Sequence, residues 1–489
     1  MDDRKVSDVT LWLVLTIGAL LIGSSLKCGY NYGNITPQSI FIKDFYNETN
    51  IDRFGVPMSE EGEAWLWGVT TAMFCIGQAI GAIAGSRWSK RYGRCRSLIF
   101  NDFISIVASI SMASSQAAGS PELLILGRAV IGFSVGVSLT IVPTYLREIC
   151  PRRLGRYVPR LHNVLFTSGI LIGQLLGVFV FSDPVVWPLA LGFTALIDLI
   201  QIGFLLFCPE SPRWLLLEKY AEERAAGAFR QLRNVEDVEK EIQSLREEHR
   251  NEERISRANE WDVLLVRDPN WKMPLLSCAI LQAGMQLSGI NALIFYSTEV
   301  FQLAGMTPAD VSVATVAWGG IFTAVTIVVF YGNLTTLPRR PLLLYPYFVL
   351  FFIVSVLILA VAFHERVDWL RWLAVCCVCA FFTAFAVGPA TMTSLVCSEL
   401  WSRAPRQAAL NISQQINMWT DVLIQLIVPG VMVMIGAYTF AIFAGSLLLT
   451  SLFICLYLPE TRDRRFVEIS TGFEMLKSAP TEDEEEGNT

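Results

Sequence analysis

Residues 143–153 read PTYLREICPRR and follow a long apolar stretch, and residues 398–406 read SELWSRAPR and follow another. Both segments place an acidic residue and several arginines directly after the apolar stretch. The two acidic residues, Glu148 and Glu399, lie 251 positions apart (399 − 148). This spacing indicates that one segment of the chain occurs twice.

Two further pairs repeat at nearly the same interval. Glu210 in PESPR and Glu460 in PETR each end an apolar stretch and lie 250 positions apart (460 − 210). The basic segments YGRCR around Arg94 and LPRRP around Arg339 lie 245 positions apart (339 − 94). In a membrane protein, such a duplication predicts a site at the interface between two halves that rock against each other.

The composition excludes an ordinary soluble protein, because the 489 residues have a mean hydropathy of +0.47 and only 17% of them are charged. A helix needs about 20 mostly apolar residues to cross a membrane. Twelve stretches qualify: 9–29, 65–85, 98–116, 122–145, 161–181, 187–207, 274–301, 312–331, 341–363, 369–396, 408–433 and 438–458. They are too long for barrel strands, so we expect an all-α membrane protein with twelve transmembrane helices in two six-helix halves.

Basic residues predict the orientation, because cytosolic connections are rich in lysine and arginine. The even-numbered connections carry the basic clusters, for example RWSKRYGRCR at 87–96 and the arginines of 147–156. We therefore expect both termini in the cytosol. The acidic and polar residues 30–64 would face the other side, where the sequon Asn47-Glu48-Thr49 predicts glycosylation in a secretory-pathway membrane, the plasma membrane in our interpretation.

The sequence divides into four predicted segments. The two halves are residues 1–208 and 274–466, a charged helical linker covers 209–273, and a disordered acidic tail covers 467–489.

The remaining composition limits partners and cofactors. The net charge of −6 says little about partners, and the 11 scattered cysteines are expected to pack in the spans. With three histidines and no ligand spacing, we expect no metal, no cofactor and no nucleic acid. The lipid bilayer surrounds the chain, and we expect a functional monomer.

A set of motifs connects these features to a known family. They are GYN at 29–31, GR at 93–94, LGRAVIGFSVG at 126–136, PTYLREICP at 143–151, PESPRWLL at 209–216, QLSGINA at 286–292, SELWSRAPR at 398–406 and LPETR at 458–462. In this order, over roughly residues 9–466, the chain resembles the animal facilitative hexose transporters of the major facilitator superfamily. FYN at 45–47 also resembles the outer loop of the fructose-transporting subgroup.

The resemblance implies a cytosolic gate whose charges pair across the two halves when that side is closed. Its residues would be Arg94, Arg128, Glu148, Arg153, Glu210 and Arg213 in the first half, and Arg340, Glu399, Arg406 and Glu460 in the second. Each exposed pair contributes only about 0–1 kcal/mol, which suits contacts that break in every cycle. The alternative is that the arginines only set the topology. The second half also lacks an acidic residue that the family has before its basic pair.

A hexose needs hydrogen-bonding partners to replace water inside a membrane, and amides both donate and accept. The candidate binding residues are Asn31, Asn163, Gln174, Gln286, Asn291, Tyr296, Ser394, Asn417 and Trp419. The motif QLSGINA carries Gln286 and Asn291, whereas the two aromatic rings would stack on the sugar. A single amide within a span can instead bond two helices together. We expect helix breaks at Gly284, Gly289 and Gly388-Pro389.

Some positions depart from the family pattern. Met285 and Met418 replace a glutamine and a tryptophan, and Phe322 stands near an expected asparagine. Ser394 stands where glucose-type members have tryptophan and fructose-type members a small residue, which favours the fructose subgroup.

Energy coupling depends on Asn31, because proton-coupled members of the family have an aspartate there and an amide cannot titrate. This favours uniport. Ionisable residues within spans complicate this interpretation, and we single out Lys27, Asp198 and Asp421. Lys27 is expected to extend to the membrane surface, although a position in the cavity would attract an anion.

These features favour a facilitative transporter of fructose, glucose or both that works by alternating access and is not an enzyme. One alternative is a carrier of an organic anion such as urate, motivated by Lys27 and by the reduced number of amides relative to the family pattern. Another is a sugar receptor that does not transport, motivated by the incomplete gate.

Overall fold

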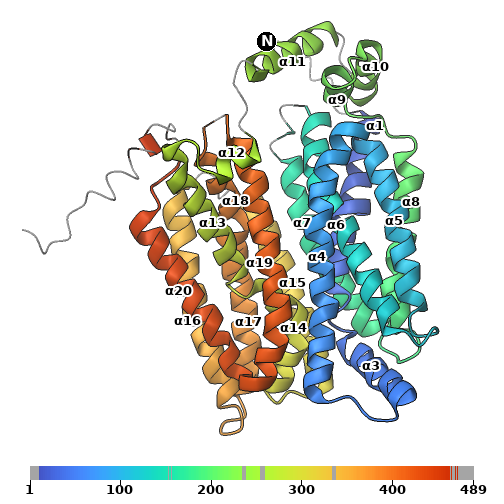
Figure 1. The fold of residues 1–489 in the computed structure, drawn as a ribbon, viewed down its shortest axis with the longest axis vertical. Coiled ribbons are helices and arrows are strands. Elements are labelled where there is room, and N and C mark those ends of the chain that lie inside the picture. Colours follow the sequence, from blue (N-terminus) through green and yellow to red (C-terminus); the bar gives the residue numbers. More distant parts are fainter. Residues whose placement is uncertain are drawn as a thin grey trace, which may run out of the picture.

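The computed structural model describes residues 10–151, 154–155, 157–233, 238–253, 259–332, 337–402, 404–462, 464, 468–469 and 471. This part of the chain is built from helices, with no strands (Figure 1). Eleven helical segments within it are long and apolar enough to cross a membrane. They account for twelve crossings, because the last segment crosses twice.

That last segment, Arg406–Tyr457, has 52 residues. At 1.5 Å per residue a straight helix of this length would extend about 78 Å, more than twice the hydrocarbon thickness. The chain turns at η4 (Gly436–Thr439), where Gly436 has φ 54°, and separates α19 (Arg406–Ile435) from α20 (Phe440–Tyr457). Thr461, just after α20, donates a 2.6 Å hydrogen bond to Glu399, just before α19. Both ends of the hairpin therefore lie at the same end of the bundle.

The first half contains six crossings. They are α1, η1 and α2 together (Leu11–Gly18, Ala19–Leu26, Lys27–Gly33), α4 (Glu60–Tyr92), α5 (Arg94–Ser114), α6 (Pro121–Ile149), α7 (Val158–Phe179) and α8 (Trp187–Leu205). The segment η1 is a π-helical turn within the first crossing. In place of an irregular loop after this crossing, the chain forms the helix α3 (Ser39–Phe54).

The second half also contains six crossings. They are α13 and α14 (Lys272–Gln286, Ile290–Leu303), α15 (Pro308–Gly332), α16 (Arg339–Ala362), α17 and α18 (Leu370–Val387, Pro389–Glu399), α19 and α20. A short 3-10 turn, η2 (Pro269–Trp271), precedes α13. The expected twelve-helix fold is confirmed.

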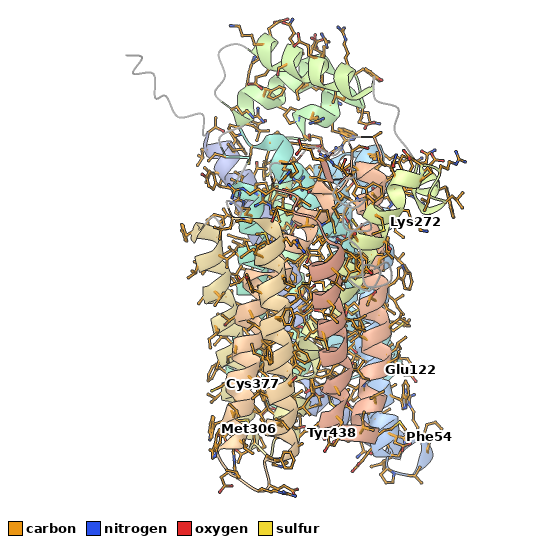
Figure 2. The ribbon with its side chains drawn as sticks, turned by 90° about the vertical axis from the view of Figure 1, so that its left-hand side faces the viewer. Phe54, Glu122, Lys272, Met306, Cys377 and Tyr438 are labelled. Atoms are coloured by element: carbon orange, nitrogen blue, oxygen red, sulfur yellow. The ribbon has the colours of Figure 1, made fainter. Side chains whose placement is uncertain are left out.

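In the described part of the connection between the halves there are four short helices: α9 (Pro212–Leu217), α10 (Glu222–Leu232), α11 (Val238–Glu253) and α12 (Glu260–Leu264). All four lie at one end of the bundle, opposite α3 (Figure 1). We call these ends the linker end and the α3 end. Figure 2 shows Lys272 toward the linker end and Phe54, Met306 and Tyr438 at the α3 end.

Two of the expected helix breaks are present. Gly289, with φ 91°, separates α13 from α14, and Gly388-Pro389 separates α17 from α18. The expected break at Gly284 is wrong, because this residue lies inside α13. There the glycine allows close packing, since a Cβ would lie 2.5 Å from the hydroxyl of Thr450 on α20.

Each half is tightly packed, and the halves meet along two helix pairs. Within the first half, α4 and α6 approach so closely that a Cβ on Gly132 would lie 2.0 Å from the backbone oxygen of Phe74. Across the interface, α19 packs against α4 and α15 packs against α7. The interface is therefore lined by these four helices and by α2 and α14, which also contact each other.

Candidate functional site

At the linker end of the first half, two glutamates fix the helix termini. Glu148 accepts hydrogen bonds from the guanidinium of Arg94 at 2.7 Å and the hydroxyl of Ser211 at 2.6 Å. Glu210 accepts the backbone N–H groups of Arg94 at 2.8 Å and Cys95 at 3.1 Å, which are free donors at the start of α5. A carboxylate at this position also opposes the positive end of the helix dipole.

The second half repeats this arrangement. Glu399 lies 3.3 Å from the guanidinium of Arg339 and accepts the hydroxyl of Thr461 at 2.6 Å. Glu460 accepts the backbone N–H groups of Arg339 at 2.9 Å and Arg340 at 3.1 Å. The duplication predicted from the spacing is thus a duplication of three-dimensional contacts.

Burial would raise the pKa of Glu460, but the hydrogen bonds from the backbone N–H groups of Arg462, Arg339, Arg340 and Thr461 outweigh it. The pKa of this carboxyl is therefore held below its ordinary value. The carboxylate remains charged at neutral pH and anchors the segment after α20 to the start of α16.

Several of the expected gate residues lie elsewhere or have other partners. Arg340 donates its guanidinium to the backbone oxygen of Cys455, and Glu399 contacts Arg339, which was not among the expected gate residues. Arg406 donates to the backbone oxygen of Trp401 at 2.9 Å. The pairs described here form within each half, so pairing across the halves stays a prediction.

Arg128 does not belong to the linker end, which corrects our expectation. It lies 20 residues before Glu148 on the same helix, about 30 Å along its axis. Its guanidinium is buried, 4.2 Å from the ring of Phe74, and donates to the backbone oxygen of Asn31 at 3.2 Å. Arg213 is partly buried at the start of α9, and Arg153 lies outside the described residues.

The expected amides of the second half form one connected cluster. Gln286 donates to the amide oxygen of Asn417 at 2.9 Å, and Asn291 donates to the amide oxygen of Gln286 at 3.0 Å. Asn291 also donates to Asp421 at 2.7 Å. These residues come from α13, α14 and α19, and the break at Gly289 brings the first two together. Gln286, Asn291 and Asn417 each retain 7–8% of their exposure.

The first half faces this interface with Gln174 of α7. Its side chain is fully buried, and neither its amide nitrogen nor its amide oxygen has a partner among the described residues. The amide lies against Gly319 of the opposite half, where a Cβ would be 1.8 Å from its oxygen. Trp318, which we did not predict, likewise has a buried indole N–H without a partner in the described structure. Buried polar groups of this kind are rare, and a ligand is one explanation.

The other expected binding residues are distributed differently. Asn31 is buried inside the first half, where it donates to the backbone oxygen of Lys27 at 3.0 Å and accepts from Thr194 at 3.1 Å. Asn163 and Ser394 are exposed. Trp419 is 45% exposed and lies two positions from Asn417, on nearly the opposite face of α19. We therefore remove Trp419 from the proposed binding residues.

Tyr296 belongs to a set of contacts that closes the α3 end. Its hydroxyl lies 2.7 Å from that of Thr71 in the first half and donates to the backbone oxygen of Gln425 at 3.1 Å. Its backbone interrupts α14, with φ −118° and ψ 16°. The tyrosine thus connects the halves, a role that we did not predict.

Three more contacts complete this closure. Thr36 donates to the backbone oxygen of Ile294 at 2.8 Å, and Thr298 donates to the backbone oxygen of Thr36 at 3.3 Å. Lys43 Nζ lies 2.9 Å from Glu299 Oε1, and both side chains are mostly buried. We call these contacts, together with Thr71–Tyr296, the α3-end closure. The sequence signal was weak, because Lys43 is followed directly by Asp44, and Glu299 is a single charge beside an apolar stretch.

Lys27 lies in the interior, so the expectation that it extends to the membrane surface is wrong. Its ammonium group is 1% exposed and lies 2.7 Å from Asp102 and 2.5 Å from Asp198. This buried triad joins α2 to α5 and α8 within one half. Burying three charged groups is unfavourable, and the direct contacts of the ammonium group with the two carboxylates offset part of that cost.

The sequon lies in α3, where the amide oxygen of Asn47 accepts the backbone N–H of Met58 at 2.8 Å. Glycosylation at this position stays a prediction. Among the described residues, no three His, Cys, Asp or Glu side chains form a group that could hold a metal ion.

A family model described as "Sugar (and other) transporter" matches residues 16–473. The chain is 33% identical over 478 residues to the Bos taurus protein named "Solute carrier family 2, facilitated glucose transporter member 5", across 98% of this chain and 95% of that protein. The chain belongs to this sugar transporter family. The Mus musculus "facilitated glucose transporter member 7" is also 33% identical over 464 residues, 94% of this chain and 90% of that protein.

Solved structures agree on the fold. The inward open conformation of the xylose transporter XylE from E. coli matches with a TM-score of 0.77 at 19% identity, across 95% of this chain and 99% of that chain. The protein is therefore a multi-pass membrane transporter of sugars with the major facilitator fold, and it is not an enzyme.

Proposed function

We propose that this sugar transporter is a facilitative uniporter of hexoses that works by alternating access. The observation that carries the proposal is Asn31, a buried amide with both its donor and its acceptor bonded inside the first half. An amide has no titratable proton. With no carboxylate at this position, the sugar would move down its own gradient and would not be driven by protons.

The proposed binding site is the amide cluster of Gln286, Asn291 and Asn417, faced by Gln174 across the interface. Amides donate and accept, so they suit the hydroxyls of a neutral polyol. The amides of the cluster bond to each other at 2.9–3.0 Å, whereas Gln174 is buried without a partner among the described residues. A sugar hydroxyl would provide that partner, and it would exchange with the bonds inside the cluster.

For the substrate we propose fructose, glucose or both. The small residue at Ser394 and the segment FYN at 45–47 favour fructose, and the relatives named above are facilitated glucose transporters. We further propose a monomer in the plasma membrane, with both termini and the linker end facing the cytosol, because the basic connections lie at that end.

The two alternatives are less well supported. An organic anion carrier was motivated by Lys27, whose charge is compensated by Asp102 and Asp198. A receptor without transport was motivated by an incomplete gate. Glu399 and Glu460 nevertheless have the same kinds of partner as their counterparts in the first half.

Radiolabel uptake into proteoliposomes tests this function. We expect saturable uptake of fructose or glucose and none of urate. Urate uptake would favour the anion carrier, and specific sugar binding without uptake would favour the receptor. Asp368→Asn, at a carboxylate that is 96% exposed, serves as a control variant with unchanged uptake.

A further inference from the structure

The side chain of Asp421 is a buried carboxylate that has only neutral partners. It is 3% exposed. Its Oδ2 accepts from Asn291 at 2.7 Å and from the thiol of Cys75 at 3.3 Å, and its Oδ1 accepts from Gln425 at 3.2 Å. A carboxylate offers about four acceptor positions. Three are occupied here, so the carboxylate has the capacity to accept one more hydrogen bond.

The buried cations of the first half are engaged elsewhere. The ammonium of Lys27 contacts Asp102 and Asp198. The guanidinium of Arg128 stacks on Phe74 and donates from Nη1 to a backbone oxygen, while its Nε and Nη2 have no hydrogen-bond partner among the described residues. Among the described residues, none of the ion pairs that we find includes Asp421. Its negative charge is therefore not in direct contact with a cation of the described residues.

An unpaired charge in a low-dielectric interior is unfavourable, and neutral hydrogen-bond donors offset only part of the cost. Buried charges are usually paired, and an ionisable residue within a membrane span marks a functional site. A cationic group that can donate a hydrogen bond would complete the surroundings of Asp421. Its three present partners are N–H and S–H donors rather than oxygen ligands, so the site does not resemble one for a hard metal cation.

The position of Asp421 indicates where that charge comes from. Asn291 donates to both Gln286 and Asp421, so the carboxylate is continuous with the amide cluster. The thiol of Cys75 reaches it from the opposite half. A ligand in the amide cluster would therefore place its neighbouring substituent beside Asp421.

We propose that this transporter carries aminohexoses, sugars with a free ammonium group, in preference to neutral hexoses. The hydroxyls bind the amide cluster, as in the proposed hexose function on which this inference rests, and the ammonium donates to Asp421. The ammonium supplies in one group the missing charge and the missing donor. Charge-assisted hydrogen bonds of this kind are about twice as strong as neutral ones.

Competition in proteoliposomes tests the proposal without any mutation. Uptake of labelled glucose or fructose is measured at about pH 6.5, where a sugar amine is protonated, against glucosamine, glucose and N-acetylglucosamine. N-acetylglucosamine is the matched control, because its nitrogen is at the same position but carries no charge. We expect glucosamine to compete at a concentration about tenfold lower than glucose, and N-acetylglucosamine to compete no better than glucose.

A variant series then assigns the preference to one carboxylate. In Asp421→Asn, the ratio of glucosamine affinity to glucose affinity should fall about tenfold, whereas Asp421→Glu should retain part of it. The exposed Asp368→Asn should retain it fully. Equal competition by glucosamine and glucose in the unmodified protein would overturn the proposal, and so would a preference that survives Asp421→Asn.

Two other outcomes distinguish a failure of this proposal from a failure of the proposed hexose function. If neutral hexose accumulates only with a proton gradient and glucosamine has no advantage, a proton supplies the charge and the proposal is wrong. If no hexose, charged or neutral, is taken up, the proposed hexose function itself fails.

Discussion

Lys43 Nζ lies 2.9 Å from Glu299 Oε1, which joins α3 of the first half to α14 of the second at the α3 end. Their side chains are 20% and 13% exposed, so water screens the pair only partly. The hydroxyl pair Thr71–Tyr296 lies at the same interface. In alternating access, these contacts must break when the α3 end opens.

Glu299→Gln should therefore shift the protein toward states open at the α3 end. A partly buried pair contributes on the order of 1 kcal/mol, which corresponds to about a fivefold change in the ratio of two states. Cys75 lies at the interface and is 1% exposed, so its labelling by a membrane-impermeant thiol reagent from the α3 side should increase. Mass spectrometry can resolve this cysteine from the others.

The control is the ion pair Arg53–Glu122, which joins α3 to α6 within the first half. Because it does not cross the interface, Arg53→Gln should leave the labelling of Cys75 unchanged. Equal labelling of Glu299→Gln and the unmodified protein would show that the Lys43 contact does not hold the halves together.

Asn291→Ala should reduce hexose uptake strongly while the protein still reaches the membrane. Asn291 donates to Gln286 and Asp421, so its loss leaves the buried amide oxygen of Gln286 without a donor, at about 1–3 kcal/mol, and leaves Asp421 Oδ2 with only the thiol of Cys75. Asn50→Ala, which removes an amide that donates to the backbone oxygen of Val56 just after α3, is the matched control and should transport normally. Normal uptake by Asn291→Ala at equal surface expression would remove the amide cluster from the binding site.

Lys27→Met should destabilise the protein by about 3–5 kcal/mol, because it leaves Asp102 and Asp198 buried without a cation. Adding Asp102→Asn and Asp198→Asn should restore much of that stability, since no unpaired charge then remains. The melting temperature in detergent measures both effects. A Lys27→Met protein as stable as the unmodified one would contradict the burial of this triad.

Glu460 predicts a pH dependence of stability. Its pKa is lower in the folded protein than its ordinary value of 4.5, so ionised Glu460 stabilises the fold above that value. This stabilisation is lost as pH falls below 4.5 and through the lowered pKa. The difference in melting temperature between the unmodified protein and Glu460→Gln should thus be constant near neutral pH and shrink in acid. A difference that grows in acid would have the wrong sign.

Much of the fold was predictable because the membrane permits few solutions. The length and spacing of apolar stretches indicated twelve crossings, and the interval between Glu148 and Glu399 indicated the repeat. Gly289 and Gly388-Pro389 signalled breaks because such residues interrupt a helix. Gly284 was also expected to interrupt a helix, but it lies inside α13 and allows close packing on Thr450. A glycine in the sequence does not distinguish these two uses.

The partners of charged residues were harder to predict, because they depend on which helices pack together. Lys27 interacts with Asp102 and Asp198, which lie 75 and 171 positions away in sequence. Arg128 looked like a gate residue from its motif, but its depth along α6 places it far from the linker end. The α3-end closure relies on backbone oxygens, such as that of Ile294, which the sequence does not reveal.

Hexose uptake into proteoliposomes with an imposed proton gradient tests uniport most directly. With Asn31 in place of a carboxylate, we predict that internal sugar rises only to the external concentration, at the same initial rate with and without acid outside. Accumulation above the external concentration that requires the gradient, and that is lost in Asp421→Asn, would contradict uniport and show a proton symporter.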